Sequence, residues 1–270
     1  MGEPRPPEGD WLGTPHLRLE RHGSLAHCVV DRPEKRNALS PAMYFGVRRA
    51  VNVVNGDPDL AGLLITGTGD VFIPGGDMSM QYDDGWSDLT DLLLNDVLPF
   101  DALRNSAKPV VSAINGLAQG GGMMIAMLSD VAVASDRATF RAPELFRGIA
   151  DTHYAQILPH HVGFARARDL LLTGRTLDAR EAVDWGLISR VVPHDELLEA
   201  ATQVLTECCW AAPRARAHVK RSINMQYGVY DRMTFDATIR EDEFAEGWKS
   251  FSERRPPSWI PQDLQPPGRL

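Results

Sequence analysis

The chain has 270 residues, a formal net charge of −8, 43% hydrophobic residues and 24% charged residues. The acidic balance argues against nucleic acid and anionic membranes as the main partners, because both attract basic surfaces. No apolar stretch is long enough for a membrane span. Three cysteines without metal-ligand spacing fit a reducing compartment. We therefore expect a cytoplasmic protein that binds neither nucleic acid nor membranes.

The N-terminal part of the chain predicts a hairpin, a helix and a buried strand. Residues 1–15 are rich in proline and acids, which indicates a flexible leader. Two β-type runs flank His22-Gly23, as in a hairpin. Ser40 is a typical N-cap and Pro41 a typical first residue of the helix that follows. The apolar run LAGLLITGTG is typical of a strand buried on both faces.

The middle of the chain alternates strands with helices. The pattern predicts a helix over roughly 86–105, a buried strand in KPVVSAING and a helix from Gly120 onward. Two short strands in DVAVASDRATFRA and a largely helical segment up to LLLTG follow. This alternation predicts a parallel α/β arrangement.

The last hundred or so residues show helical patterns and no strands. The predicted helices are DAREAVDWGL, DELLEAATQVLTECCWA, RARAHVKRSINMQYG and REDEFAEGWKSFSERR. We therefore expect an α/β core over residues 16–195, a helical region over 196–259 and an extended, proline-rich tail over 260–270.

Two glycine-rich turns are candidate ligand sites. They are FIPGGDM, residues 72–78, and GLAQGGGMM, residues 116–124. Glycine lets a ligand approach the backbone closely, and a turn that opens a helix favours negative charge. Two such turns on neighbouring strands can each point one N–H group at a single oxygen and form an oxyanion hole. The alternative is two tight structural turns. Neither turn matches a phosphate loop.

Several motifs occur in the order found in one known family. They are DRPEKRNALS, FIPGGDM, KPVVSAINGLAQGGG, SDVAVAS, ATFRAPELFRGI, LLLTGRTLDAREAVDWGLISRVV and FAEGWKSFSERRPPSW. Across residues 16–259 the sequence resembles the crotonase superfamily, the enoyl-CoA hydratase/isomerase proteins. The resemblance implies the α/β crotonase (ClpP-like) fold of repeated ββα units with a helical C-terminal region for trimerisation. It also implies a homotrimer or a hexamer built as a dimer of trimers.

The resemblance further implies an acyl-CoA substrate, with coenzyme A as part of the substrate and neither a separate cofactor nor a metal. The thioester oxygen would lie between the N–H groups of Gly76 and Gly121, which stabilise an enolate. The matching motifs imply CoA and substrate contacts by Lys35, Arg36, Ala38, Asp77, Met78, Met124, Phe251 and Arg254. Lys35 and Arg36 would meet phosphates, although a solvated charged turn is the alternative. Phe251 and Arg254 match positions that reach a CoA bound to a neighbouring subunit.

The sequence offers two candidate proton carriers, Glu144 and Asp151. Hydratases of the family use two glutamates, and Met124 stands where the first would be. The second is present as Glu144 in RAPEL. Asp151 matches a catalytic aspartate of dienoyl-CoA isomerases, but its spacing from Glu144 is one residue shorter. Asp151 is equally a candidate helix cap. Burial beside methionines would raise the pKa of Glu144 toward the range useful for acid–base catalysis.

A single glutamate can take a proton from one carbon and return it two carbons away. The sequence therefore favours an enoyl-CoA isomerase with Glu144 as the proton carrier. Enoyl-CoA hydration with help from Asp151, and a non-catalytic CoA-binding role, are the alternatives. A minor alternative is C–C bond hydrolysis by His153 with Asp151, although two residues apart on a helix they would not face each other. The acyl pocket is expected in residues 79–105.

Overall fold

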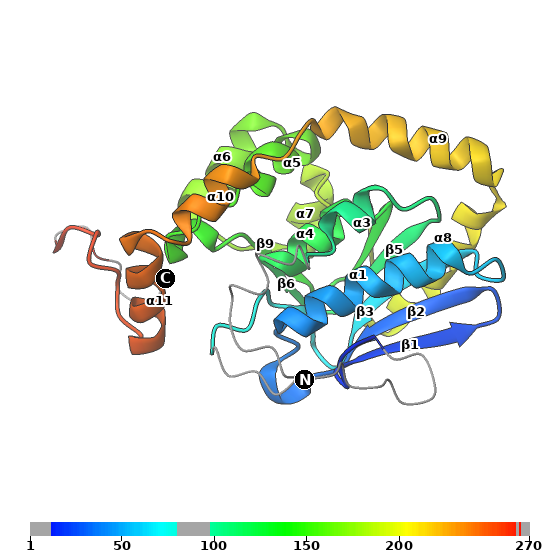
Figure 1. The fold of residues 1–270 in the computed structure, drawn as a ribbon, viewed down its shortest axis with the longest axis horizontal. Coiled ribbons are helices and arrows are strands. Elements are labelled where there is room, and N and C mark those ends of the chain that lie inside the picture. Colours follow the sequence, from blue (N-terminus) through cyan, green and yellow to red (C-terminus); the bar gives the residue numbers. More distant parts are fainter. Residues whose placement is uncertain (1–11, 80–97, 263–264, 266–270) are drawn as a thin grey trace, which may run out of the picture. The chain divides into compact units, whose positions relative to one another are not determined.

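The computed structural model describes residues 12–79, 98–262 and 265 (Figure 1). Most of the expected leader, most of the segment expected to shape the acyl pocket, and much of the tail lie outside the described residues. Contacts divide the chain into two compact units, Met1–Phe140 with Leu177–Gln226 and Arg141–Thr176 with Tyr227–Leu270. The chain therefore leaves the first unit after Phe140 and returns to it at Leu177.

The first unit contains a six-stranded sheet in the order β1-β2-β3-β5-β7-β10. Its strands are β1 (Leu17–His22), β2 (Leu25–Val30), β3 (Gly62–Gly67), β5 (Val110–Ile114), β7 (Val131–Ser135) and β10 (Arg190–Val192). The β1–β2 pair is antiparallel, which confirms the predicted hairpin, and each later pair is parallel. The predicted parallel α/β arrangement is therefore confirmed.

A second sheet in the order β4-β6-β8-β9 carries the two glycine turns. Its strands are β4 (Val71–Ile73), β6 (Leu117–Gln119), β8 (Thr139–Arg141) and β9 (Leu177–Asp178). Because β4 and β6 are parallel neighbours, the turns that follow them begin at the same edge of the sheet. The expectation that the last hundred residues hold no strands was wrong. The strands β9 and β10 have only two and three residues, too short to leave an alternating pattern.

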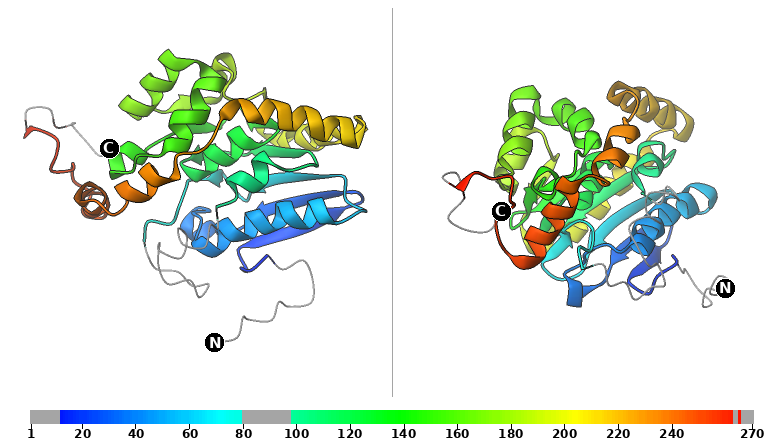
Figure 2. Two further views of the ribbon diagram at one scale, coloured as in Figure 1. Left: turned by 45° about the horizontal axis from the view of Figure 1, so that its top comes forward. Right: turned by 60° about the vertical axis from the view of Figure 1, so that its left-hand side comes forward.

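The described part of the first unit also contains helices. They are α1 (Pro41–Gly56), α3 (Phe100–Arg104), α4 (Gly121–Leu128), α7 (Ala179–Trp185), α8 (Leu197–Trp210) and α9 (Pro213–Asn224). Ser40 caps α1 as predicted, because its hydroxyl accepts from the N–H of Met43 at 3.3 Å. Figure 2 shows α1 beside the β1–β2 hairpin. Of the helix expected over roughly 86–105, the described part forms α3.

The helix α8 packs on strands β3, β5 and β7 and forms a hydrophobic core with them. Its buried side chains recur at helical spacing and pack against the strands. The cluster comprises Leu64, Val111, Ala113, Val133, Leu197, Ala201, Val204 and Leu205. Each large apolar side chain buried in this way stabilises the fold by about 1.5–3 kcal/mol.

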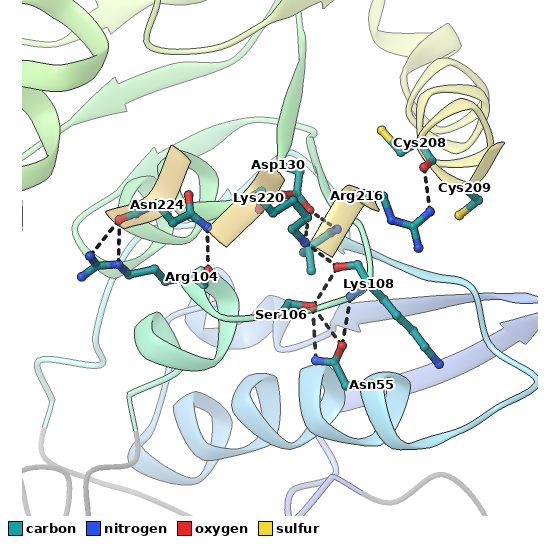
Figure 3. Close-up of polar contacts among 12 residues, drawn as sticks. Asn55, Arg104, Ser106, Lys108, Asp130, Cys208, Cys209, Arg216, Lys220 and Asn224 are labelled. Atoms are coloured by element: carbon teal, nitrogen blue, oxygen red, sulfur yellow. Dashed lines mark hydrogen bonds and ion pairs between the residues drawn. The ribbon is translucent and has the colours of Figure 1, made fainter. Parts of the chain in front are cut away.

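Within the first unit, charged and polar side chains join the helix α9 to neighbouring segments (Figure 3). Lys220 donates to the Asp130 carboxylate at 2.7 Å and to the Lys108 carbonyl at 2.6 Å. Near the end of the helix, Arg104 and Asn224 exchange side chain to backbone hydrogen bonds. Burial lowers the pKa of Lys220 and raises that of Asp130, although each charge opposes the shift of the other.

The second unit is built from helices α5 (Thr152–Val162), α6 (Phe164–Thr173), α10 (Arg232–Thr238) and α11 (Asp242–Glu253). The helix α11 lies against the 3-10 turn Glu144–Arg147. Gly247 makes this approach possible, because a Cβ there would lie 2.5 Å from the Arg147 carbonyl oxygen. The turn that carries Glu144 is therefore held by a helix from the C-terminal part of the chain.

The described part of the chain has no helix long and apolar enough to cross a membrane. All three cysteines are free thiols, and Cys28 is buried. Burial raises the pKa of Cys28 to about 12, so its thiol is unreactive at neutral pH.

Candidate active site

The turn after β4 presents a backbone N–H group at Gly76. Gly75 has a φ of 104°, a conformation that glycine adopts without strain. On either side of Gly76, the N–H of Leu39 donates to the Gly75 carbonyl at 2.9 Å, and the N–H of Asp77 donates to the Leu39 carbonyl at 2.8 Å. No hydrogen bond among the described residues uses the N–H of Gly76, and this glycine is exposed. Gly76 therefore has an N–H group available to a ligand.

The turn after β6 presents a second N–H group at Gly121. Gly120 precedes α4 with φ 53° and ψ −128°, a conformation that is restricted almost entirely to glycine. The first N–H groups of a helix have no acceptor within the helix. Within the described ranges, the N–H of Gly121 makes no hydrogen bond. The dipole of α4 adds partial positive charge at this end and favours a developing oxyanion.

The two turns adjoin, and Tyr44 of α1 lies against both. A Cβ on Gly75 would lie 3.3 Å from the Gln119 carbonyl oxygen and 3.8 Å from the N atom of Gly121. A Cβ on Gly76 would lie 3.7 Å from the Tyr44 hydroxyl, and a Cβ on Gly121 would overlap that hydroxyl. The structure thus brings together the two glycines predicted for the oxyanion hole. Sequence reasoning missed Tyr44, whose position in an ordinary amphipathic helix gives no signal.

Gly122 has a different role from Gly121. A Cβ on Gly122 would overlap the carbonyl oxygen of Ile73 and lie 2.8 Å from its carbonyl carbon. The start of α4 therefore packs directly on the backbone of β4. This contact fixes the Gly121 turn relative to the strand that leads to Gly76.

A buried ion pair stabilises the turn around Gly76. Arg32 donates to the Asp77 carboxylate at 2.8 Å and to the Ala38 carbonyl at 3.2 Å, and the two charged side chains are only 1% and 5% exposed. Burial raises the pKa of Asp77, but hydrogen bonds from Ser79 and Arg32 outweigh burial and lower it overall. The Asp77 carboxylate, predicted to contact substrate, is thus engaged by Arg32 and Ser79. Met78 beside it is half-buried.

The loop predicted to wrap the nucleotide of CoA is fixed by Asn37. Asn37 has a left-handed φ of 62°. Its side chain accepts from the Arg32 N–H at 2.9 Å and donates to the Val71 carbonyl at 2.7 Å. The Lys35 ammonium group contacts the Ser79 hydroxyl at 3.3 Å, and Arg36 is exposed. Sequence reasoning grouped Arg32 with the basic residues that could hold a phosphorylated ligand and missed its buried contact with Asp77. It also missed Asn37, although an asparagine in a turn is a signal for left-handed backbone.

Met124 is completely buried on α4, as is Met123. Its N–H donates to the Gly120 carbonyl at 3.1 Å, so it belongs to the first turn of the helix. The position therefore offers an apolar thioether in place of a carboxylate.

Glu144 begins the 3-10 turn of the second unit. Its Oε2 atom is buried and has no hydrogen-bond partner among the described residues. Burial, and then the negative charge of Asp151, raise the pKa of Glu144 to about 8, while Arg147 and Arg141 act in the opposite direction. A carboxyl group in this range can both accept and donate a proton near neutral pH.

Asp151 caps α5 and also acts on Glu144. Its carboxylate accepts from the N–H groups of His153 at 3.0 Å and Tyr154 at 3.4 Å. The Nδ1 atom of His153 also lies 3.6 Å from the Asp151 carboxylate. The expectation that these two side chains would not face each other was wrong, because Asp151 precedes the helix instead of lying within it.

The two C-terminal residues predicted to contact CoA lie on or next to α11. The guanidinium carbon of Arg147 is 4.3 Å from the centre of the Phe251 ring. Arg254 ends α11 in a left-handed conformation, with φ 57°. Their contacts with CoA stay a prediction. The described residues contain no group of three or more His, Cys, Asp or Glu side chains that could hold a metal ion.

Comparison with known proteins decides the family. A model of enoyl-CoA hydratase/isomerase matches residues 20–262. The chain belongs to the enoyl-CoA hydratase/isomerase family. The resemblance to this family predicted from the ordered motifs is confirmed, and the protein is an acyl-CoA-processing enzyme of that family.

Relatives of this enoyl-CoA hydratase/isomerase family member include both reaction types. A probable enoyl-CoA hydratase of Mycobacterium tuberculosis is 32% identical over 90% of this chain and 97% of its own length. An enoyl-CoA hydratase structure from Mycobacterium avium subsp. paratuberculosis has a TM-score of 0.79 and 25% identity, covering 90% of this chain and 98% of that one. A monofunctional enoyl-CoA isomerase of M. smegmatis has a TM-score of 0.68 and 27% identity, covering 83% and 99%. The predicted crotonase fold is confirmed.

Proposed function

We propose that the protein is an enoyl-CoA isomerase, which moves the double bond of a 3-enoyl-CoA to the 2,3 position. Glu144 carries this proposal, because its carboxyl has a buried, unpartnered oxygen and a pKa of about 8. A monofunctional isomerase is among the similar structures. Met124 supports the same choice, since the first glutamate of a two-glutamate hydration site is replaced by a thioether.

The mechanism begins with the thioester oxygen accepting hydrogen bonds from the N–H groups of Gly76 and Gly121. The Glu144 carboxylate then removes a proton from carbon 2. The electron pair of that C–H bond enters the conjugated system, and negative charge collects on the thioester oxygen. Each N–H donor contributes about 2.7–4 kcal/mol to the stability of such a transition state.

The dienolate is then protonated at carbon 4 by the Glu144 carboxylic acid. The C3–C4 double bond becomes single, the C2–C3 bond becomes double, and the thioester carbonyl reforms. Glu144 ends the cycle as the carboxylate with which it began. Burial, and then the negative charge of Asp151, keep Glu144 basic enough to accept a proton from carbon. One carboxyl group therefore suffices for both proton transfers.

Hydration of a 2-enoyl-CoA is a second candidate. The negative charge of Asp151 acts on Glu144 within the second unit, so two carboxyl groups are available despite the methionine at position 124. A relative with 32% identity carries a hydratase name. In this reaction one carboxyl group would take a proton from water while the other delivers a proton to carbon 2.

Parallel assays with 3-enoyl-CoA and 2-enoyl-CoA test the proposal. We expect the wild-type protein to convert the 3-enoyl-CoA and Glu144→Gln to lose about 10²–10⁴-fold in kcat. The Asp151→Asn variant separates the two candidates, because isomerisation should survive with a changed pH profile and hydration should be abolished. Rapid hydration of the 2-enoyl-CoA with no turnover of the 3-enoyl-CoA would exclude the isomerase.

We also propose that Lys35, Arg36 and the backbone near Ala38 bind the nucleotide part of CoA. Lysine and arginine cations suit phosphate groups, and the Arg36 side chain is exposed. A homotrimer or hexamer in the cytoplasm, with Phe251 and Arg254 reaching the CoA of a neighbouring subunit, completes the proposal. Sedimentation equilibrium gives the subunit number, and Arg254→Ala should raise KM without changing kcat.

A further inference from the structure

A short segment of the second unit joins the proposed proton carrier to the aspartate that acts on it. The N–H of Ile149 donates to the Glu144 carbonyl at 3.0 Å, and the N–H of Asp151 donates to the Ile149 carbonyl at 3.1 Å. These two backbone bonds keep the segment folded between the two carboxyl groups. The position of Asp151 relative to Glu144 therefore depends on how residues 149–151 are held.

Both neighbours of Asp151 are bonded to the helix α10. Before it, the N–H of Ala150 donates to the Thr238 hydroxyl at 3.2 Å. After it, the Thr152 hydroxyl donates to the Asp231 carbonyl at 2.6 Å. Asp231 is the N-cap of α10 and Thr238 is its last residue. The two ends of one helix thus hold the chain on either side of this aspartate.

The Thr238 hydroxyl is oriented to accept this hydrogen bond. It donates its own proton to the Phe235 carbonyl at 3.0 Å, which leaves its lone pairs for the N–H of Ala150. Aromatic rings add to the contact between α10 and the start of α5. Phe235 lies edge-on to the His153 ring at 6.5 Å between ring centres, and Tyr230, just before α10, stacks on the same ring at 3.2 Å.

The place of Asp151 matters because its charge acts on the proton carrier. The energy between two charged groups falls as the distance between them grows. The charge of Asp151 is the second cause, after burial, of the raised pKa of Glu144. Other charged groups that act on Glu144 or lie on α10 include Arg141, Arg147, Arg232 and Asp236. The substitutions proposed below leave these four side chains in place.

We propose that Thr238 is a positioning residue for the proton transfer, because together with Thr152 it holds Asp151 at a fixed place relative to Glu144. The helix α10 thereby sets how readily the Glu144 carboxyl accepts and releases a proton, although it supplies no reacting group. Without the Thr238 hydroxyl, the N–H of Ala150 loses its acceptor and residues 149–151 can move. This inference rests on the proposed function, since it concerns the same proton carrier.

The titration of the Glu144 carboxyl tests the inference directly. NMR spectra of protein with isotope-labelled glutamate carboxyl groups are recorded across pH, and the Glu144 signal is assigned by its absence in Glu144→Gln. Thr238→Val replaces the hydroxyl by a methyl group, whereas Thr238→Ser keeps the hydroxyl. We expect Thr238→Val to move the Glu144 midpoint to lower pH, in the same direction as Asp151→Asn but by less. Thr238→Ser should stay close to wild type.

A double variant separates positioning from a general effect on the structure. In the Asp151→Asn background the charge is already gone, so adding Thr238→Val should move the midpoint no further. Thr173→Val is the matched control, since it makes the same chemical change in the same unit at a hydroxyl that donates to the Asp169 carbonyl at 2.6 Å within α6. It should leave the midpoint unchanged.

Three results would overturn the inference. They are a wild-type midpoint in Thr238→Val, a further shift when Thr238→Val is added to Asp151→Asn, and an equal shift in Thr173→Val. If circular dichroism shows that Thr238→Val does not fold, Thr152→Val tests the other end of α10, with the same expected shift.

These titrations need no turnover, so they separate this inference from the proposed function. A protein that leaves 3-enoyl-CoA unchanged while the midpoints move as expected removes the isomerase and keeps the positioning role. If 3-enoyl-CoA is converted, the inflection of kcat/KM against pH should move with the midpoint in each variant. Turnover with an inflection that stays in place in Thr238→Val would reject the positioning role and keep the isomerase.

Discussion

The Tyr44 hydroxyl fills the space that a Cβ on Gly121 would need, and the Tyr44 ring carbon Cζ would lie 2.9 Å from that Cβ. The proposed oxyanion hole is therefore bounded on one side by a residue of α1. This contact ties the geometry of a backbone N–H group to the packing of a helix more than 70 residues earlier in the chain.

We predict that Gly121→Ala lowers kcat by roughly 10²–10³-fold, the usual loss for one oxyanion donor, because Tyr44 or the turn must move. Gly76→Ala should lose less than tenfold, since its Cβ would lie at an ordinary 3.7 Å from the same hydroxyl. Steady-state kinetics of both variants provide the measurement. Adding Tyr44→Phe to Gly121→Ala should restore part of the rate, and an unchanged rate would show that the clash with the hydroxyl is not the cause.

The buried pair of Arg32 and Asp77 predicts a large effect on stability. Arg32→Met leaves the Asp77 carboxylate uncompensated in the interior, so the free energy of unfolding should fall by about 3–5 kcal/mol. Replacing both residues, as in Arg32→Met with Asp77→Leu, should cost less than the single change because no buried charge remains. Urea unfolding measures both. A double variant less stable than Arg32→Met would contradict this account.

The raised pKa of Glu144 predicts that its contribution to stability decreases with rising pH. The folded protein holds this proton more tightly than the unfolded chain, whose ordinary value is 4.5. The contribution is therefore fully present below about pH 4.5 and is lost by about pH 8. Relative to Glu144→Gln, the wild-type free energy of unfolding should fall across this window by up to about 1.4 kcal/mol per pH unit. A difference that is flat or rises with pH would refute the assignment.

The kcat/KM of the enzyme should rise over the pH range in which the contribution of Glu144 to stability falls. Proton removal from carbon 2 needs the Glu144 carboxylate, so kcat/KM should rise about tenfold per pH unit and level off near pH 8. Asp151→Asn removes a negative charge that raises this pKa, so the inflection should move to lower pH. The pH profiles of the two proteins give the comparison. An inflection at the same pH in both would mean that Asp151 does not tune Glu144.

The sequence predicts the glycine turns well because their requirements are local. A helix cap at Ser40, a glycine with positive φ and a buried apolar strand each leave a signal within a few residues. The roles predicted for Gly76, Gly121 and Glu144 come instead from the ordered motifs, because these residues match functional positions in the motifs of a known family. The fold class follows from the same two sources.

Contacts between residues far apart in the sequence could not be predicted from the sequence. Tyr44 meets Gly121, and Tyr230 meets His153, across separations of more than 70 residues. Nothing near either tyrosine in the chain indicates these contacts. The capping role of Asp151 is a local property that the sequence can indicate, whereas its effect on Glu144 depends on how the turn and the helix pack. Its role in catalysis stays a prediction.

The three successive glycines at the start of α4 have three independent reasons to lack a side chain. Gly120 needs its backbone conformation, Gly121 must accommodate Tyr44, and Gly122 must accommodate the carbonyl of Ile73. No single second-site change relieves more than one of these constraints. The tripeptide is therefore a rigid part of the enzyme, and engineering a different reaction has to begin at side chains such as Met124 or Asp151, which can change while this backbone stays in place.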